Sequence, residues 1–323
     1  MKKERSKKRF TLIAALLLSV VIITDCTNDE SIDPIVDWVT FENYPSVDGS
    51  TSTAPLNTII ACKLLGIRYK WEKDSDDMWS VRPVFKSKKD SEKFAKLPIK
   101  SSQTHQSFIN LIDKKTDIIL TARTMSPDEK ASADNAGVRL IETPIALDAF
   151  VFIVNPNNPI TSLTIKQIQD IYTGEITNWN EVGGNDALIK PYVRNANSGS
   201  QELMESLVMK DLNMLDNLPE SAEIIFSMGG AFERVVYDVD GICYTVYYYK
   251  ENILKDIRTK GIAVNSIYPN KENITNNSYP LVAEVYAVIR DDLNELSTAY
   301  KLYELLQTEI GKKVIAESGY LPN

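Results

Sequence analysis

Two patterns of apolar positions alternate along this chain. Short apolar runs, such as residues 117–125 and 145–156, are each followed by a segment in which apolar residues recur every three or four positions. The first pattern is typical of buried strands and the second of amphipathic helices. Because strands that alternate with helices usually form parallel sheets with helical crossovers, the chain is predicted to have an α/β fold.

Proline and glycine refine the bounds of these elements: Pro55 suits the first turn of a helix, and Gly66 and Gly174 suit helix ends. The predicted strands are 39–47, 117–125, 145–156, 189–196, 241–249 and 279–290. The predicted helices are one within 48–66 that has Pro55 in its first turn and Gly66 at its end, 104–112 with Thr104 as N-cap, 164–172 and 201–209, with a helical pair in 296–323. We interpret residues 67–98, which are charged and aromatic, as a solvated surface insert without a chemical role.

The N-terminus reads as a targeting segment. A strongly basic start is followed by an apolar run over 10–23, and Cys26 comes directly after it. This pattern resembles a bacterial lipoprotein signal, and the run is too short for a comfortable membrane span. We expect residues 1–25 to be the signal peptide, Cys26 the lipidated first residue and 26–38 a tether, which places the protein outside the cytoplasm, anchored in the cell envelope. Asp25 departs from the small residue usual before that cysteine, and cleavage elsewhere is the alternative.

The charge of the exported chain excludes some classes of partner. Residues 1–25 carry six basic and two acidic residues, so their removal changes the formal net charge from −8 to −12. An acidic surface does not suit a nucleic-acid binder or a protein that adheres to anionic membranes. Any anion site must therefore be built locally, from aimed amides, hydroxyls and one or two arginines.

The cysteines and the single histidine limit the chemistry further. Cys62 and Cys243 lie in apolar segments, where buried thiols are favoured over a disulfide. No pair of cysteines or histidines has the spacing of metal ligands, and His105 is the one histidine of the chain. We predict no metal site, no cofactor and no catalytic residues.

Three predicted strand–helix junctions contain hydroxyl-rich turns. Their turns are Gly49–Ser52, Ser102–Thr104 and Ser198–Ser200. The first turn of a helix has unpaired N–H groups and a partial positive charge, so small hydroxyl residues there favour an oxyanion. In open α/β sheets such junctions lie at the carboxyl ends of strands, where ligands bind. The alternative reading of each turn alone is ordinary helix capping.

Two arginines strengthen the interpretation as an anion site. Arg194 ends the strand that leads into Ser198–Ser200, and Arg123 ends another predicted strand. A guanidinium matches a tetrahedral oxyanion with two parallel hydrogen bonds. Each arginine alone is equally consistent with a surface ion pair.

The sequence resembles the phosphate-binding proteins of bacterial phosphate ABC transporters, in the periplasmic-binding-protein superfamily. The matching stretches occur in order over nearly the whole exported chain. They are DGSTSTAPL, LDAFVFIVNPNNPITSLTIKQIQDIYTGEITNWNEVGG, RNANSGSQELM, YPLVAEVYAVIR and LYELLQTEIGKKVIAESGYLPN.

The resemblance implies a type II fold, with two Rossmann-like α/β lobes joined by two crossing strands that close on a ligand. The first lobe would comprise 39–149 and 246–323, and the second 150–245. Carried over by position, the ligand-binding residues would be Ser50, Thr51, Ser52, Arg123, Arg194, Ser198, Gly199 and Ser200, with Gly49, Thr104 and His105 as further candidates.

Two positions depart from the family pattern. Arg123 stands where the family commonly has an aspartate that accepts the proton of HPO₄²⁻, which puts the discrimination between phosphate and sulfate in question. Ala196 replaces an aspartate often found two residues after the family's arginine, so Arg194 lacks that orienting partner.

The resemblance implies a lipid-anchored, monomeric receptor that captures inorganic phosphate for an ABC permease. One alternative is a receptor for another oxyanion, such as sulfate or molybdate, or for a phosphorylated small molecule. A second is a surface scavenger or sensor without a transporter. A third, from another class, is a serine hydrolase, which the absence of a G-x-S-x-G elbow argues against.

Overall fold

The computed structural model describes residues 32–210, 212, 214 and 218–323. The predicted signal peptide, Cys26 and the first part of the tether lie outside the described residues. Within the described part of the chain, no helix combines the length and the apolar character needed to cross a membrane.

A mixed sheet runs through the described part of the protein. Its central path is β1 (Val47–Gly49), β4 (Ile118–Thr121), β12 (Val282–Arg290), β5 (Leu140–Val154), β9 (Gly241–Val246), β7 (Lys190–Arg194) and β8 (Glu223–Ile225). The pairs β1–β4, β7–β9 and β7–β8 are parallel, as alternating strands and helices predict. By contrast, β12 is antiparallel to both β4 and β5, and β5 is antiparallel to β9. The predicted α/β class is confirmed, and the sheet is mixed rather than parallel.

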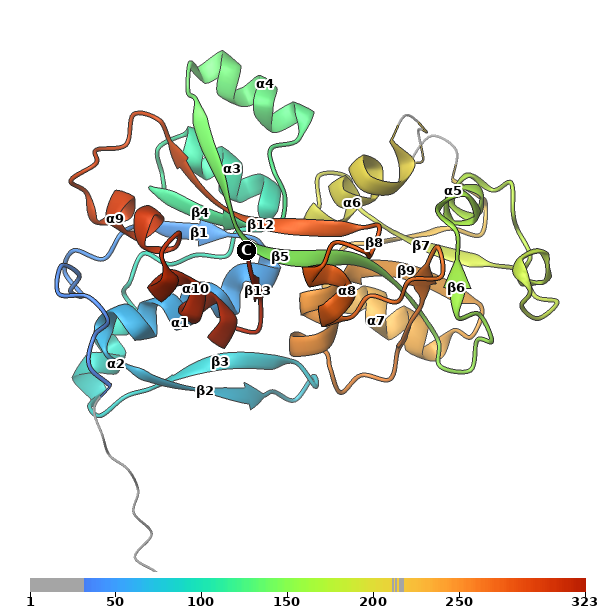
Figure 1. The fold of residues 1–323 in the computed structure, drawn as a ribbon, viewed down its shortest axis with the longest axis horizontal. Helices are drawn as coiled ribbons and strands as arrows, with labels where there is room; N and C mark the ends of the chain where they lie inside the picture. The colour runs from blue at the N-terminus through green and yellow to red at the C-terminus, as the bar shows by residue number, and fades with distance from the viewer. Residues whose placement is uncertain (1–31, 211, 213, 215–217) are drawn as a thin grey trace, which may run out of the picture. The chain divides into compact units, whose positions relative to one another are not determined.

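Strand β5 connects two lobes (Figure 1). Its residues 140–149 pair with β12, and its residues 150–154 pair with β9. Two short strands, β10 (Lys260–Gly261) and β13 (Leu321–Pro322), add to β5 near Val154 and near Leu147. The lobe with β1 and β4 is called lobe 1 and the lobe with β7 and β8 is called lobe 2. Their predicted residue boundaries stay a prediction.

Helices cover the sheet in both lobes (Figure 1). Those of lobe 1 are α1 (Ala54–Leu65), α2 (Lys88–Phe94), α3 (Thr104–Ile112), α4 (Pro127–Ala136), α9 (Thr298–Leu305) and α10 (Glu309–Glu317). Those of lobe 2 are α5 (Ile165–Thr173), α6 (Gly199–Leu203) and α7 (Met228–Tyr237). A π-helix, Met204–Met209, continues α6, and α8 (Lys271–Thr275) packs near β5. Gly66 and Gly174 end α1 and α5 in the left-handed conformation, as predicted.

The core follows the apolar strands. Every residue of β5 from Ile145 to Val154 is buried, and the aromatic rings of Phe150, Phe152, Tyr172 and Tyr244 pack edge-on or tilted against one another. Such clusters combine large apolar areas with favourable ring geometry. Cys62 and Cys243 are free and buried, so the prediction of buried thiols is confirmed. Burial raises the pKa of each thiol to about 12.

Two regions differ from the sequence predictions. The strand predicted over 39–47 is wrong for most of its length, because only Val47–Gly49 pairs with a neighbour, β4. Within 67–98, strands β2 (Arg68–Lys73) and β3 (Trp79–Val84) form an antiparallel hairpin of their own beside α1. The hairpin was missed because charged and aromatic residues mask its alternation, since most of its side chains stay partly exposed.

A carboxyl group is buried on β5, the strand that connects the lobes. Asp148 of β5 is 1% exposed, and its Oδ1 accepts the N–H groups of Ala149 at 2.8 Å and Tyr248 at 2.9 Å. Its Oδ2 is buried and has no hydrogen-bond partner among the described residues. Burial raises the pKa of Asp148 to about 7, well above its ordinary value of 3.8.

This carboxyl is expected to make the protein less stable as the pH rises from about 4 to about 7. In that window the unfolded chain has lost a proton that the folded chain still holds, so the free energy of unfolding falls as pH rises through the raised pKa, by at most about 4 kcal/mol. Thermal unfolding at several pH values should show that Asp148→Asn loses much of this dependence. An equal fall in the variant and the natural protein would contradict the assignment.

Candidate functional site

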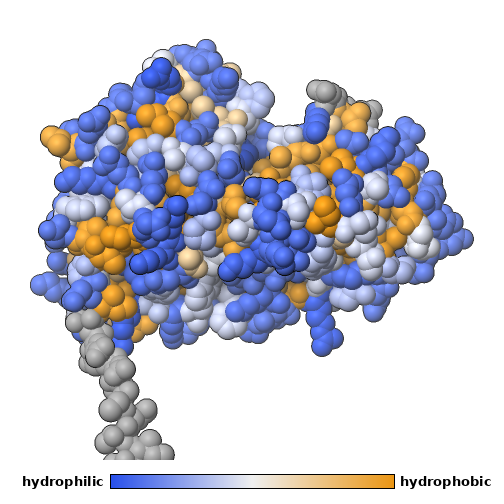
Figure 2. All heavy atoms as spheres, in the orientation of Figure 1, coloured by the Kyte–Doolittle hydropathy of each residue, from blue (hydrophilic) through white to orange (hydrophobic). Residues whose placement is uncertain are grey.

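A cavity of about 520 Å³ is lined by residues of both lobes. The space-filling view shows the surface hollowed between the two lobes (Figure 2). Most of the predicted ligand-binding residues line this cavity, namely Ser50, Thr51, Ser52, Thr104, Arg194, Ser198, Gly199 and Ser200. The structure thus brings together the hydroxyl-rich turns that the sequence separates by almost 150 positions. Gly49, His105 and Arg123 are not among the lining residues.

Lobe 1 contributes the turn after β1. Thr51–Thr53 form a single 3₁₀ turn that leads directly into α1. The Ser50 hydroxyl accepts the Ala122 N–H at 3.2 Å and lies 2.9 Å from the Thr104 hydroxyl. Thr104 is the first residue of α3 rather than its cap, because Gln103 occupies the cap position with a φ of 71°. The two hydroxyls, both buried, are therefore held side by side in the cavity wall.

Gly49 has a structural role behind this wall. A Cβ at this position would lie 2.4 Å from the Leu120 carbonyl oxygen and 2.7 Å from Thr53 Oγ1. A side chain would therefore push β1 away from β4 and displace the turn. Glycine is required here for close packing, and the prediction of Gly49 as a ligand contact is not supported by its position.

Lobe 2 contributes the turn between β7 and α6. The Ser198 hydroxyl caps α6 by accepting the Gln201 N–H at 3.2 Å. The Tyr244 hydroxyl accepts the Arg194 N–H at 2.8 Å and donates to Gln201 Oε1. One tyrosine of β9 thus fixes both the end of β7 and the start of α6. The N–H groups of the first turn and the Ser200 hydroxyl are left at the cavity wall.

Arg194 is a buried cation without a carboxylate partner. The residue is 6% exposed, and its Nε donates to the Ile225 carbonyl at 2.9 Å. Among the described residues, Nη1 and Nη2 have no hydrogen-bond or ion-pair partner in the protein. Burial lowers the pKa of Arg194, but a guanidinium stays charged in proteins. Because an uncompensated buried charge is costly, this arrangement favours an anion in the cavity.

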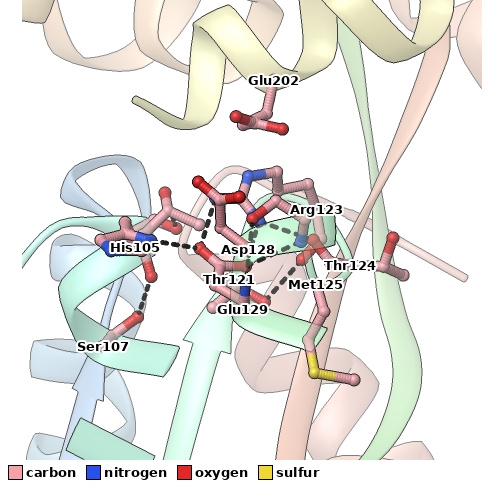
Figure 3. A network of polar contacts seen from close by, with 12 residues as sticks. His105, Ser107, Thr121, Arg123, Thr124, Met125, Asp128, Glu129 and Glu202 are labelled. Atoms are coloured by element: carbon pink, nitrogen blue, oxygen red, sulfur yellow. Dashed lines mark hydrogen bonds and ion pairs between the residues drawn. The ribbon is translucent and has the colours of Figure 1, made fainter. Parts of the chain in front are cut away.

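Arg123 does not line the cavity and forms an ion pair with Glu129 of lobe 1 (Figure 3). Its guanidinium forms two hydrogen bonds with the Glu129 carboxylate, Nη1 to Oε2 at 2.7 Å and Nη2 to Oε1 at 2.8 Å. Both side chains are at most 5% exposed. Nη1 also donates to the Thr124 carbonyl at 2.7 Å. The charge of Arg123 is therefore compensated inside lobe 1, and the expected ligand contact from this residue is not supported.

His105 joins the same network. Its Nδ1 lies 3.0 Å from Glu129 Oε1, and its side chain is one-third exposed. Since His105 is hydrogen-bonded to the Glu129 carboxylate and lies outside the cavity lining, nothing in its position supports a role as the base of a serine hydrolase. The expected ligand contact from His105 is likewise not supported.

Glu202 of α6 approaches this network from the other lobe (Figure 3). Burial raises the pKa of the Glu202 carboxyl, and the positive charge of Arg123 partly offsets the rise. The charges of Glu129 and Asp128 add to the rise in the same direction. The two lobes therefore approach each other closely enough for these groups to interact electrostatically.

Two further segments of the cavity wall were missed from the sequence. One is the tip of the β2–β3 hairpin, Ser75–Met78, and the other is Phe226–Gly230 at the start of α7. The hairpin tip gives no local signal, because its position over the cavity depends on tertiary packing. The second segment reads FSMGG after a short strand, a serine–glycine turn of the same kind as Ser198–Ser200, and could have been recognised.

Two α/β lobes around a ligand-sized cavity, joined by a shared strand, define the class of periplasmic binding proteins. The chain belongs to the PBP superfamily: the family model described as PBP superfamily domain matches residues 83–306.

Several relatives of this chain have names that refer to phosphate. A phosphate-binding protein PstS from Borreliella burgdorferi is 28% identical over 218 residues, which are 65% of this chain and 74% of the relative. One from Staphylococcus epidermidis is 24% identical over 280 residues, 85% of this chain and 77% of the relative. A solved substrate-binding protein assigned to phosphate ABC transport, with bound phosphate, from Clostridium perfringens is 25% identical with a TM-score of 0.63, covering 87% of this chain and 100% of that one.

Proposed function

We propose that this protein captures inorganic phosphate in the cavity between its lobes and delivers it to an ABC importer. The observation that carries the proposal is the Arg194 guanidinium, which is buried at the cavity and has no partner for Nη1 and Nη2 among the described residues. A tetrahedral oxyanion is the kind of ligand that matches such a fork with two parallel hydrogen bonds.

The surrounding donors fit the same ligand. The proposed contacts are Ser50, Thr51, Ser52, Thr104, Arg194, Ser198, Gly199 and Ser200. Hydroxyls and first-turn amides from opposite walls supply donors to several oxygens of one anion, and the start of each helix adds partial positive charge. The names of the relatives, and the phosphate bound to the Clostridium perfringens protein, support phosphate as the anion.

The proposal includes the expected cellular placement. Residues 1–25 would direct export, Cys26 would carry the lipid anchor, and the polar tether after it would hold the binding lobes at the cell envelope. Lobe 1 would comprise 39–149 and 246–323. Two short strands of the second range pair on the side of lobe 2, however: β10 pairs with the end of β5, and β11 (Ala263–Val264) pairs with β6 (Ser162–Leu163). Proteolysis of intact cells would distinguish a surface-exposed protein from a periplasmic one.

Calorimetric titration of the purified protein tests the ligand. Phosphate is expected to bind with a dissociation constant in the micromolar range or below, and sulfate and molybdate at least tenfold more weakly. The binding protein would be assigned to another oxyanion if sulfate or molybdate bound more tightly than phosphate. Absence of binding for all three would overturn the proposal.

The close approach of the two lobes at Gly199 leaves no room for a side chain. A Cβ on Gly199 would lie 2.6 Å from Thr104 Oγ1, across the cavity in lobe 1. Gly199→Ala is therefore expected to hold the lobes apart and to weaken phosphate binding at least tenfold. Thr104→Ala removes the clashing oxygen and leaves its Cβ at 3.5 Å, so the double variant should bind more tightly than Gly199→Ala alone.

A matched control is Gly229→Ala. Gly229 also lines the cavity, but a Cβ there would have no atom within 4 Å. Its phosphate affinity should stay within about threefold of the natural protein, a change below 1 kcal/mol. If Gly199→Ala bound phosphate as tightly as Gly229→Ala, the proposed approach of the two turns on closure would be incorrect.

A further inference from the structure

The cavity is larger than an inorganic oxyanion requires. Phosphate has five heavy atoms, whereas cavities of about 300–1,000 Å³ hold drug-sized organic ligands. The cavity here measures about 520 Å³, and the hydroxyls, amides and guanidinium proposed to hold phosphate form only part of its wall.

Part of the remaining lining is apolar or aromatic, and the rest is polar. The apolar part includes Met78, Phe226, Met228, Tyr249, Leu254 and Ile257, which we call the apolar wall. Tyr249 and Leu254 are at most 3% exposed and form part of the core, whereas Phe226 is 75% exposed. A large exposed aromatic ring beside a polar anion site is a typical surface for the organic part of a ligand.

The hairpin tip is held in place over this part of the cavity. The Trp79 Nε1–H donates to Asp256 Oδ2 at 2.9 Å, and Lys73 forms an ion pair with the same carboxylate at 3.4 Å. Within the tip, Asp74 Oδ1 accepts the N–H groups of Asp76 at 3.0 Å and Met78 at 2.9 Å. These contacts fix Met78 as part of the wall.

The described part of the lining has one cation, at the proposed phosphate site, and its carboxylates lie outside the proposed phosphate contacts. Arg194 is the one lysine or arginine among the described lining residues, while Asp76, Asp77 and Glu233 are carboxylates in the lining. Asp77 pairs with Lys73 at 2.8 Å, but Asp76 and Glu233 take part in no ion pair among the described residues. An organic group with a negative charge would be repelled there, and a neutral or cationic group would be accepted.

We infer that the same cavity also binds phosphate monoesters, with the phosphoryl group at Arg194 and a neutral or cationic organic group against the apolar wall. The inference rests on the proposed function, because it uses the same anion site. A monoester keeps three terminal oxygens for that site, and its bridging oxygen directs the organic group along the cavity. Cationic groups gain additionally from the aromatic faces of the wall and from Asp76.

Competition titrations against inorganic phosphate test the inference. The probes are phosphocholine, which has a cationic group, phenyl phosphate, which has an apolar group, and phosphoglycolate, which has an anionic group. Phosphocholine and phenyl phosphate are expected to bind within about tenfold of inorganic phosphate, and phosphoglycolate at least tenfold more weakly than phosphocholine. If phosphate binds and none of the esters does, the inference is wrong while the proposed function stands; if no probe binds, both are wrong.

Substitutions in the wall separate the two parts of the cavity. Phe226→Ala should weaken phenyl phosphate and phosphocholine at least threefold and leave inorganic phosphate within twofold. Asp76→Asn should weaken phosphocholine alone. Tyr237→Ala is the matched control, since Tyr237 is an exposed aromatic residue of the same lobe outside this cavity. Equal weakening of phosphate and esters by Phe226→Ala would overturn the assignment of the apolar wall.

Discussion

Replacement of Arg194 by alanine is expected to weaken phosphate binding by at least about thirtyfold, which corresponds to a loss of about 2 kcal/mol or more. The reason is that Arg194 is the one unpaired buried cation of the cavity lining among the described residues. Arg194→Lys keeps a charge but loses the fork of two parallel donors, so it should bind with intermediate affinity. Calorimetric titration of the three proteins measures the effect.

The folded state provides an internal check on this result. Without ligand, Arg194 is a buried charge with no compensating carboxylate, so alanine is not expected to lower the free energy of unfolding of the free protein by much. A matched control is Arg234→Ala, which removes an exposed arginine paired with Glu223 at 2.6 Å. It should leave phosphate binding unchanged. Binding by Arg194→Ala at the natural affinity would remove the main support for the anion site.

The largest effect on stability is expected from Glu129→Ala. This change leaves Arg123 buried without its partner, which typically costs about 3–5 kcal/mol. It also removes the Glu129 carboxylate from the capping box of α4, in which that group accepts the Ser126 N–H at 2.8 Å. Chemical denaturation of the ligand-free protein measures the loss. Glu92→Ala, in an exposed pair with Lys88, is the control and should change stability by less than about 1 kcal/mol.

The same network distinguishes two roles for Arg123. If this arginine acts only inside lobe 1, Arg123→Ala should lower stability while the folded protein binds phosphate within about threefold of the natural affinity. If it reaches the ligand on closure, the loss of affinity should approach that of Arg194→Ala. The geometry of the Arg123–Glu129 pair favours the first outcome.

The turns that the sequence placed at strand–helix junctions, and that line the cavity, are local features of the chain. Ser198–Ser200 follows a strand and caps a helix, and both features are set by neighbouring residues. Ser50–Ser52 likewise follow a strand and precede α1, although the Ser50 side chain makes no capping hydrogen bond. A hydroxyl-rich turn between a buried strand and a helix can therefore be recognised from the neighbouring sequence alone, without knowing which residues lie across the cavity.

The incorrect or missing parts depend on contacts between distant residues. The hairpin tip reaches the cavity because Trp79 bonds to Asp256, 177 positions later in the chain. β5 begins at Leu140, earlier than predicted, because its residues 140–149 pair with β12 from the C-terminal part of the chain. One local signal was available, however: the S-x-x-E spacing of Ser126 and Glu129 predicts a capping box, and that glutamate is the partner of Arg123.

The passage of one unbroken strand through both lobes has a consequence for cooperativity. Because β5 borders β12 over one stretch and β9 over the next, melting either lobe would strip a neighbour from the same fifteen-residue backbone segment. The lobes are thus energetically linked in a way that two domains on a flexible connector are not. An anion bound between the lobes would stabilise the folded state of both. Ligand binding would therefore raise the free energy of unfolding of the two lobes together.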